Sequence, residues 1–159
     1  MGLILYRRVP RIAIFLSLIF LLSGCIGEDY DVGVPTAHLS LELMSVKLAE
    51  GNISWKTASE DVQYTVNNIE EIALSEDEIV LWPNQLVSIN FEENEENGGD
   101  IFTDEKVTAS LLKDDQRVDL ELNDVYEFNV PTESGNYVLE VNFKNSAGEV
   151  QYLGNVRIN

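Results

Sequence analysis

The segment Tyr137-Val138-Leu139-Glu140-Val141-Asn142-Phe143 determines the fold expected of this 159-residue chain. Large apolar residues occupy its odd-numbered positions, which places them on one face of a β-strand. Asn145-Ser146-Ala147-Gly148 follows and is typical of a turn. A second alternating run, from Val150 to Ile158, closes the chain. This region therefore predicts two strands joined by a turn.

The same period of two recurs upstream. Apolar residues alternate in the runs 39–43, 62–66, 87–91, 107–111, 118–122 and 126–130. Lys113-Asp114-Asp115-Gln116 is a predicted hairpin turn, and Pro131 ends its strand because proline cannot donate to a ladder. Roughly eight short strands, with a turn about every ten residues, predict an all-β sandwich.

Three features of the first half are less regular. The alternation changes parity at Leu43-Met44, which predicts a β-bulge. Gly51-Asn52 predicts a turn before Ile53-Ser54-Trp55. Asn68, with Glu71 three residues later, is typical of a helix start, so one helical turn is expected there, with a short strand as the alternative.

Ser134-Gly135-Asn136-Tyr137, followed by Leu139 and Val141, resembles the tyrosine corner of immunoglobulin-like domains. The resemblance implies an immunoglobulin-like antiparallel sandwich of about 7–9 strands. It also implies that the Tyr137 hydroxyl bonds back to the main chain and that Trp55 is the buried core tryptophan. Leu139 stands where antibody domains have a disulfide cysteine, so that landmark is missing. A surface binding role is the alternative for Trp55.

The N-terminus is organised as a secretory signal. Arg7, Arg8 and Arg11 precede the apolar run Ile12–Leu22, in which only Ser17 is polar. That run is shorter than the roughly 20 residues that a membrane-spanning helix needs. Export through the Sec route is expected, because the two adjacent arginines lack the other residues of a twin-arginine signal.

Leu22-Ser23-Gly24-Cys25 resembles the lipobox of bacterial lipoproteins. The resemblance implies cleavage between Gly24 and Cys25 and a diacylglyceryl lipid on the Cys25 thiol, with fatty acyl chains such as palmitate. Two or more chains give stable attachment, at about 0.8 kcal/mol per buried methylene. The expected location is the extracytoplasmic face of the cell membrane. An ordinary signal peptide with an incidental cysteine is the alternative.

The order of these features resembles that of small surface lipoproteins of Bacillus-like bacteria. The shared features are the lipobox, an acidic spacer, Val34-Pro35-Thr36, Gly51 to Trp55, and Phe128 to Tyr137. The resemblance implies a host type and a compartment, but no activity. Three segments follow: a signal peptide (1–24), a lipidated tether (25–35) and one sandwich domain (36–159).

Charge and cysteine content limit the partners. Removing residues 1–24, which hold three arginines and no acid, leaves 7 basic and 28 acidic residues and a net charge of −21. Such an anionic body is repelled by phosphate, so nucleic acid is excluded as a partner. With the single cysteine given to lipid, the domain has no internal disulfide, and a monomer is expected. The charge could instead reflect a saline or alkaline habitat.

Catalytic motifs are sparse. The one histidine, His38, has no cysteine to join it in a metal site or a triad. Ser110-Leu111-Leu112-Lys113 has the serine–lysine spacing of penicillin-binding enzymes, but that motif needs a helix, and here it lies on a predicted strand.

The acidic loop from Glu92 to Asp100 is the remaining candidate site, with Asp104 and Glu105 just beyond it. Carboxylate and amide oxygens are ligands that calcium prefers, so a weak calcium site is predicted. Its candidate ligands are Glu92, Glu93, Asn94, Glu95, Glu96 and Asp100. The loop does not match an EF-hand, and a solvated acidic loop is the alternative.

The function expected from these observations is that of a membrane-anchored surface lipoprotein, acting as a non-catalytic binding or structural module for a cationic partner or calcium. No cofactor besides the lipid is expected. The alternatives are an envelope-acting hydrolase that uses paired carboxylates and a small solute-binding lipoprotein with an apolar pocket between its sheets.

Overall fold

The computed structural model describes residues 33–57, 61–93, 101–114 and 116–159. This part of the chain forms eleven strands and one short helix, α2 (Ile69–Ser75). The strands are β1 (Thr36–Leu41), β2 (Met44–Lys47), β3 (Ala49–Lys56), β4 (Asp61–Tyr64), β5 (Ile79–Leu81), β6 (Leu86–Glu92), β7 (Lys106–Lys113), β8 (Gln116–Leu120), β9 (Glu127–Asn129), β10 (Gly135–Lys144) and β11 (Gly148–Ile158).

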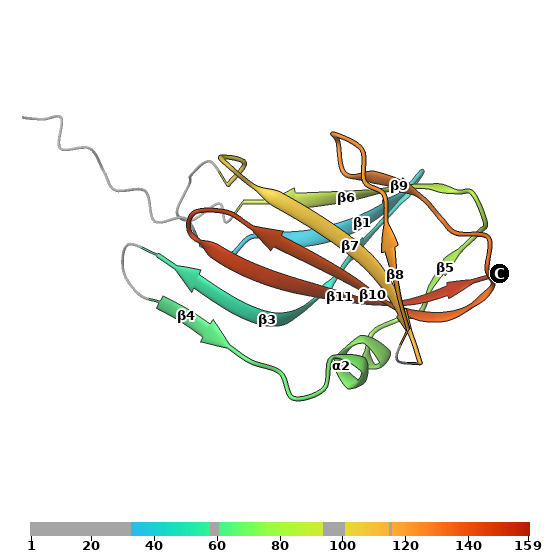
Figure 1. The fold of residues 1–159 in the computed structure, drawn as a ribbon, viewed down its shortest axis with the longest axis horizontal. Coiled ribbons are helices and arrows are strands. Elements are labelled where there is room, and N and C mark those ends of the chain that lie inside the picture. Colours follow the sequence, from blue (N-terminus) through green and yellow to red (C-terminus); the bar gives the residue numbers. More distant parts are fainter. Residues whose placement is uncertain (1–32, 58–60, 94–100, 115) are drawn as a thin grey trace, which may run out of the picture.

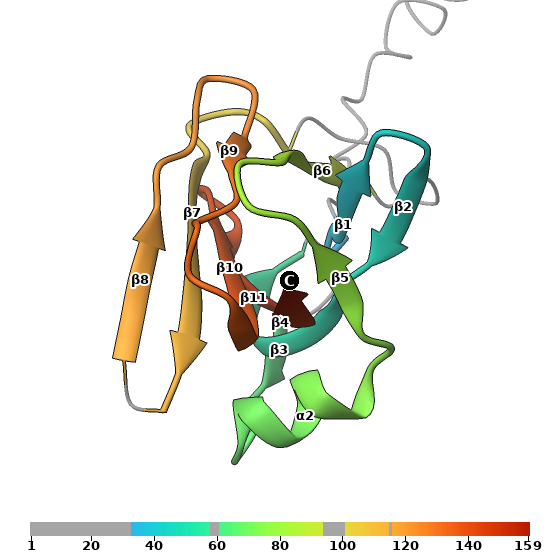
Figure 2. The same ribbon diagram turned by 90° about the vertical axis from the view of Figure 1, so that its right-hand side faces the viewer.

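The strands form two sheets (Figures 1 and 2). The small sheet has the order β2-β1-β6-β9, and the large sheet has the order β4-β3-β11-β10-β7-β8. Neighbouring strands are antiparallel, except that β5 pairs in parallel with the end of β11. The expected mostly β, two-sheet architecture is therefore confirmed, and it is consistent with a β-sandwich.

The core lies between the inner faces of the two sheets. Its largest side chains include Trp55, Phe143 and Tyr152, each fully buried. The Phe143 ring centroid lies 4.7 Å from that of Phe91 on the small sheet and 6.2 Å from that of Trp55. Burying side chains of this size contributes about 1.5–3 kcal/mol each, so these aromatic residues are large individual contributors to the stability of the domain.

The outer face of the large sheet has a second, smaller apolar cluster beneath α2. Ala73 of the helix packs there with Val138 of β10 and Leu153 of β11. The predicted helical turn is confirmed. Asn68 caps it, because its side-chain oxygen accepts the N–H groups of Glu70 at 3.1 Å and Glu71 at 3.3 Å.

Both predicted hairpins of the second half are confirmed. β10 and β11 pair along their whole length, from Gly135 with Ile158 to Lys144 with Glu149. β7 and β8 pair up to Lys113 with Gln116, at the predicted turn.

Two predictions for the first half were wrong. The parity change at Leu43-Met44 is a two-residue hairpin turn between β1 and β2, because Leu41 pairs with Met44 and Glu42 adopts a φ of 32°. Gly51-Asn52 is not a turn but lies inside β3. The separate β2 and the three-residue β5, too short for a periodic signal, bring the count above the expected 7–9 strands.

The described end of the predicted tether is packed against the domain. Gly33 and Pro35 are buried, and the buried Tyr152 hydroxyl donates to the Pro35 carbonyl at 2.7 Å. In the described ranges, no helix is long and apolar enough to cross a membrane.

Candidate functional site

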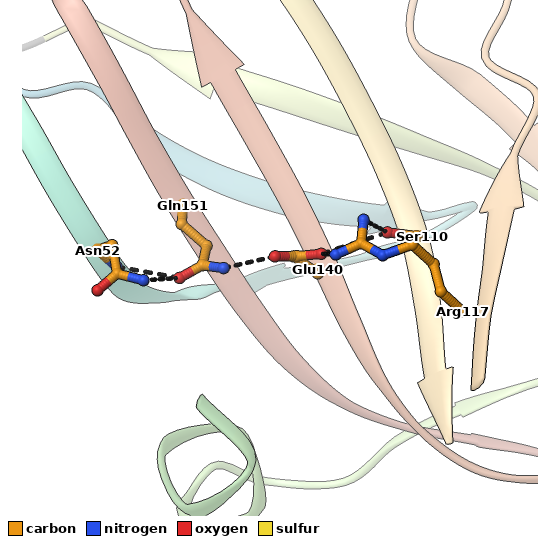
Figure 3. Close-up of polar contacts among 5 residues, drawn as sticks. All are labelled: Asn52, Ser110, Arg117, Glu140 and Gln151. Carbon is orange, nitrogen blue, oxygen red and sulfur yellow. Dashed lines mark hydrogen bonds and ion pairs between the residues drawn. The ribbon is translucent and has the colours of Figure 1, made fainter. Parts of the chain in front are cut away.

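A row of polar side chains crosses the outer face of the large sheet (Figure 3). Each of five strands contributes one residue: Asn52 (β3), Gln151 (β11), Glu140 (β10), Ser110 (β7) and Arg117 (β8). Glu140 is 5% exposed, Gln151 8% and Ser110 2%. These five residues are called here the polar network. Its three middle members are buried although they lie outside the core between the sheets, whereas Asn52 is partly buried and Arg117 is half exposed.

The hydrogen bonds of the polar network link the strands one after another. Asn52 donates to Gln151 Oε1 from its side chain at 2.8 Å and from its main chain at 3.1 Å. Gln151 Nε2 donates to Glu140 Oε1. The Arg117 guanidinium pairs with Glu140 Oε2 and donates to Ser110 Oγ at 2.8 Å.

The direction of these bonds follows from the chemistry of Arg117 and Glu140. A guanidinium can only donate and a carboxylate can only accept, so Gln151 must turn its NH₂ group toward Glu140 and its carbonyl toward Asn52. Asn52 in turn directs its own Oδ1 to the Val66 N–H, 2.9 Å away. One arrangement satisfies every member, and this fixes the side chains in place.

Gly51 allows β3 to approach Gln151 closely. A Cβ atom at residue 51 would lie 2.7 Å from Gln151 Oε1. The β3–β11 ladder shifts register between Val150 and Tyr152, at the same place. Glycine is therefore needed at residue 51 because the Gln151 side chain lies close to the backbone of β3, not because the chain turns there.

The polar network does not have the form of a catalytic group. The Glu140 carboxylate is occupied by Arg117 and Gln151. Lys113, the lysine of the serine–lysine spacing, pairs with Glu133 at 3.9 Å, whereas Ser110 bonds Arg117. The two side chains of that motif thus have separate partners, as expected on a strand.

Three shallow hollows meet at Tyr64, an exposed residue of the edge strand β4. The first, of about 300 Å³, lies between β4 and the strands β3, β10 and β11. The second, of about 520 Å³, is lined by the Lys47–Glu50 segment, Tyr64, Ile72 and Glu76. The third, of about 390 Å³, extends along α2 past Glu71. Tyr64 is 53% exposed, and of the residues that the structure describes it alone lines all three.

Carboxylates surround Tyr64. Glu50 and Glu76 line the second hollow, Glu71 the third and Glu149 the first. Among the described residues, Lys47 is the one basic residue that lines these hollows, and Lys144 pairs with Glu149 at 3.3 Å. The arrangement offers an aromatic face amid net negative charge.

The predicted calcium ligands are only partly described. Glu92 lies 3.5 Å from His38 Nε2, and Glu93 accepts the N–H of Ile101 at 3.1 Å. Asn94, Glu95, Glu96 and Asp100 lie outside the described residues, as do Gly24 and Cys25. Within the described ranges, no group of three or more His, Cys, Asp or Glu side chains is placed to hold a metal.

The two predicted structural residues are both in the core. Tyr137 is 6% exposed, and its hydroxyl donates to the Glu133 carbonyl at 3.0 Å. Trp55 is 0% exposed and lies on the inner face of β3. The alternative of a surface binding role for Trp55 is therefore wrong.

Glu105 beside the acidic loop is engaged with Tyr126. The Tyr126 hydroxyl donates to Glu105 at 2.5 Å. Burial, followed by this hydrogen bond and the Glu105 charge, raises the pKa of Tyr126 to about 12. Glu105 thus stabilises a neutral phenol.

The sequence did not indicate the polar network or Tyr64 as a site. Glu140 and Gln151 occupy the polar positions of alternating strands, where solvent exposure is the default expectation.

No protein-family model, curated protein or solved structure matches this chain.

Proposed function

We propose that the chain is a lipoprotein anchored through Cys25 at the extracytoplasmic face of the cell membrane, and that its folded part is a non-catalytic binding module. The lipobox and the preceding signal layout support the anchor. The two-sheet fold and the engaged carboxylate of the polar network support binding rather than catalysis.

The domain is proposed to be immunoglobulin-like. Two observations support this assignment: the bond from the Tyr137 hydroxyl to the main chain of Glu133, which is the bond of a tyrosine corner, and the buried Trp55.

The proposed partner is a basic peptide or protein segment that binds around Tyr64. The observation that carries this proposal is the meeting of three hollows at an exposed aromatic ring, with Glu50, Glu71 and Glu76 beside it. A lysine or arginine side chain over the ring would gain a cation–π interaction of about 0.5–1 kcal/mol. The carboxylates would add attraction that salt weakens. Calcium is less favoured, because Glu92 and Glu93 have other partners.

A short polylysine peptide tests the partner class. The full chain, purified in detergent, should bind it with an affinity that falls as sodium chloride is added. The double variant Glu50→Gln/Glu76→Gln should bind about fivefold more weakly, since two exposed charges contribute about 1 kcal/mol together. The control Glu121→Gln/Asp124→Asn removes two exposed charges elsewhere. If the two double variants weaken binding equally, net charge alone explains the effect, which would contradict a site at Tyr64.

Mass spectrometry and fractionation test the anchor separately. The wild-type protein should carry the added mass of acyl chains and fractionate with membranes. The Cys25→Ser variant should lack that mass and leave the membrane fraction. An unlipidated protein that begins elsewhere than residue 25 would contradict the anchor without affecting the binding proposal.

A further inference from the structure

The first hollow differs in chemistry from the two beside α2. It is lined by residues of β3, β4, β10 and β11 and by Thr65, which follows β4. Most of its lining residues carry an amide or a hydroxyl group: Asn52, Ser54, Gln63, Tyr64, Thr65, Asn142 and Gln151. Its single carboxylate, on Glu149, is paired with Lys144.

Several of these groups are available to a ligand. Within the described residues, the side chains of Asn142, Tyr64 and Thr65 make no hydrogen bond to the protein. Gln63 donates from Nε2 to Ser54 Oγ at 2.9 Å, and the Gln63 carbonyl and the Ser54 hydroxyl proton have no partner in the part of the chain that the structure describes. The hollow thus offers both donors and acceptors.

The floor of the hollow is held rigidly. Asn52 and Gln151 belong to the polar network, which fixes the orientation of both amides through Glu140. A rigid floor lowers the entropy lost on binding, because these side chains are already ordered.

We propose that this hollow binds a neutral saccharide. Each sugar hydroxyl both donates and accepts, which matches the mixed set on Asn142, Gln63 and Thr65. A cation would instead require acceptors alone. The ring of Tyr64 at the rim supplies an apolar face for the C–H side of a sugar ring. A volume of about 300 Å³ is at the small end of ligand pockets, which suits one sugar unit of a longer glycan.

NMR titration of the full chain in detergent micelles tests the proposal. The probes are cellotriose, chitotriose and maltotriose at millimolar concentration. At least one should shift the side-chain amide signals of Asn142 and the ring signals of Tyr64, with an affinity insensitive to sodium chloride. If none of the three binds, the proposal is overturned.

Two substitutions locate the binding. Asn142→Ala should weaken it about tenfold, as expected from losing one or two hydrogen bonds, and should fold normally because this amide has no hydrogen-bond partner among the described residues. The isosteric Asn142→Asp, which loses the donor, should also bind more weakly. The control Asn129→Ala removes an exposed amide on the small sheet. Binding that survives both Asn142 variants overturns the assignment to this hollow.

The outcome is separable from the polylysine experiment. Glu50→Gln/Glu76→Gln should leave saccharide binding unchanged, since neither residue lines this hollow. Asn142→Ala should in turn leave polylysine binding unchanged, whereas Tyr64→Ala should weaken both, because its ring faces both ligands.

Discussion

Both faces of the large sheet carry buried side chains, but different interactions hold those side chains in place. The inner face is closed by apolar rings such as Phe143 and Trp55, which pack without directional bonds. The outer face is closed by a directed chain of hydrogen bonds through Gln151 and Glu140. Packing of apolar side chains supplies most of the free energy of folding, whereas the hydrogen bonds of the polar network fix the orientation of the side chains on the outer face. The outer face, which carries the polar network, also borders the hollows around Tyr64.

The largest expected effect is on the inner face. Phe143→Ala should lower the free energy of unfolding by about 3–5 kcal/mol, because it opens a cavity between Trp55 and Phe91. Urea unfolding measures the loss. Leu43→Ala, at a fully exposed position, should change it by about 0.5 kcal/mol or less. Similar losses at both positions would contradict the packing described.

Breaking the ion pair of the outer face should cost less. Arg117→Met leaves the Glu140 carboxylate buried without its guanidinium, and a loss of about 2–3 kcal/mol is expected because Arg117 itself is half exposed. Arg157→Met breaks a pair with Glu78 that is exposed on both sides, so about 0–1 kcal/mol is expected there. If the two losses are equal, the burial of Glu140 contributes nothing.

Gly51→Ala tests the close approach of β3 and β11. The added methyl group would displace the Gln151 side chain, and a loss of about 1–2 kcal/mol is expected. The side-chain amide signals of Asn52 and Gln151 should shift in NMR spectra as their hydrogen bond is strained. Unchanged amide signals would show that the methyl group is accommodated without moving the polar network.

The smallest effect concerns alkaline pH. The pKa of Tyr126 is raised from 10.0 to about 12, so between these values the folded protein holds a proton that the unfolded chain releases. Stability is therefore full below pH 10 and falls as the pH rises toward 12. Burial also raises the pKa of Tyr152, which acts in the same direction. Tyr126→Phe should make this decline shallower, as followed by thermal unfolding, and an identical decline would contradict the assignment.

The sequence correctly predicted the elements that depend on short-range patterns. The β10–β11 and β7–β8 hairpins follow from alternation with a turn between, and the helix follows from the Asn68 cap. The sequence wrongly predicted a turn at Gly51, because a glycine that allows two sequence-distant strands to approach cannot be told from a turn glycine by sequence alone. A three-residue parallel strand such as β5 has no periodic signal at all.

The candidate site was less predictable than the fold. Tyr64 has no local mark that separates it from the other tyrosines, since its position at the junction of three hollows depends on β4 being an edge strand beside α2. The burial of Glu140 likewise depends on Arg117 from a neighbouring hairpin. Acidic composition indicated a cationic partner but could not indicate where on the surface one would bind.

The most direct test of the binding proposal is Tyr64→Ala in the full chain, with polylysine affinity and unfolding measured on the same sample. Tyr64 is exposed and lies outside the core, so the free energy of unfolding should change by about 0.5 kcal/mol or less. Peptide affinity should fall about three- to fivefold with the loss of the ring. Unchanged affinity, or a loss that accompanies unfolding, would contradict the claim that Tyr64 marks the binding face.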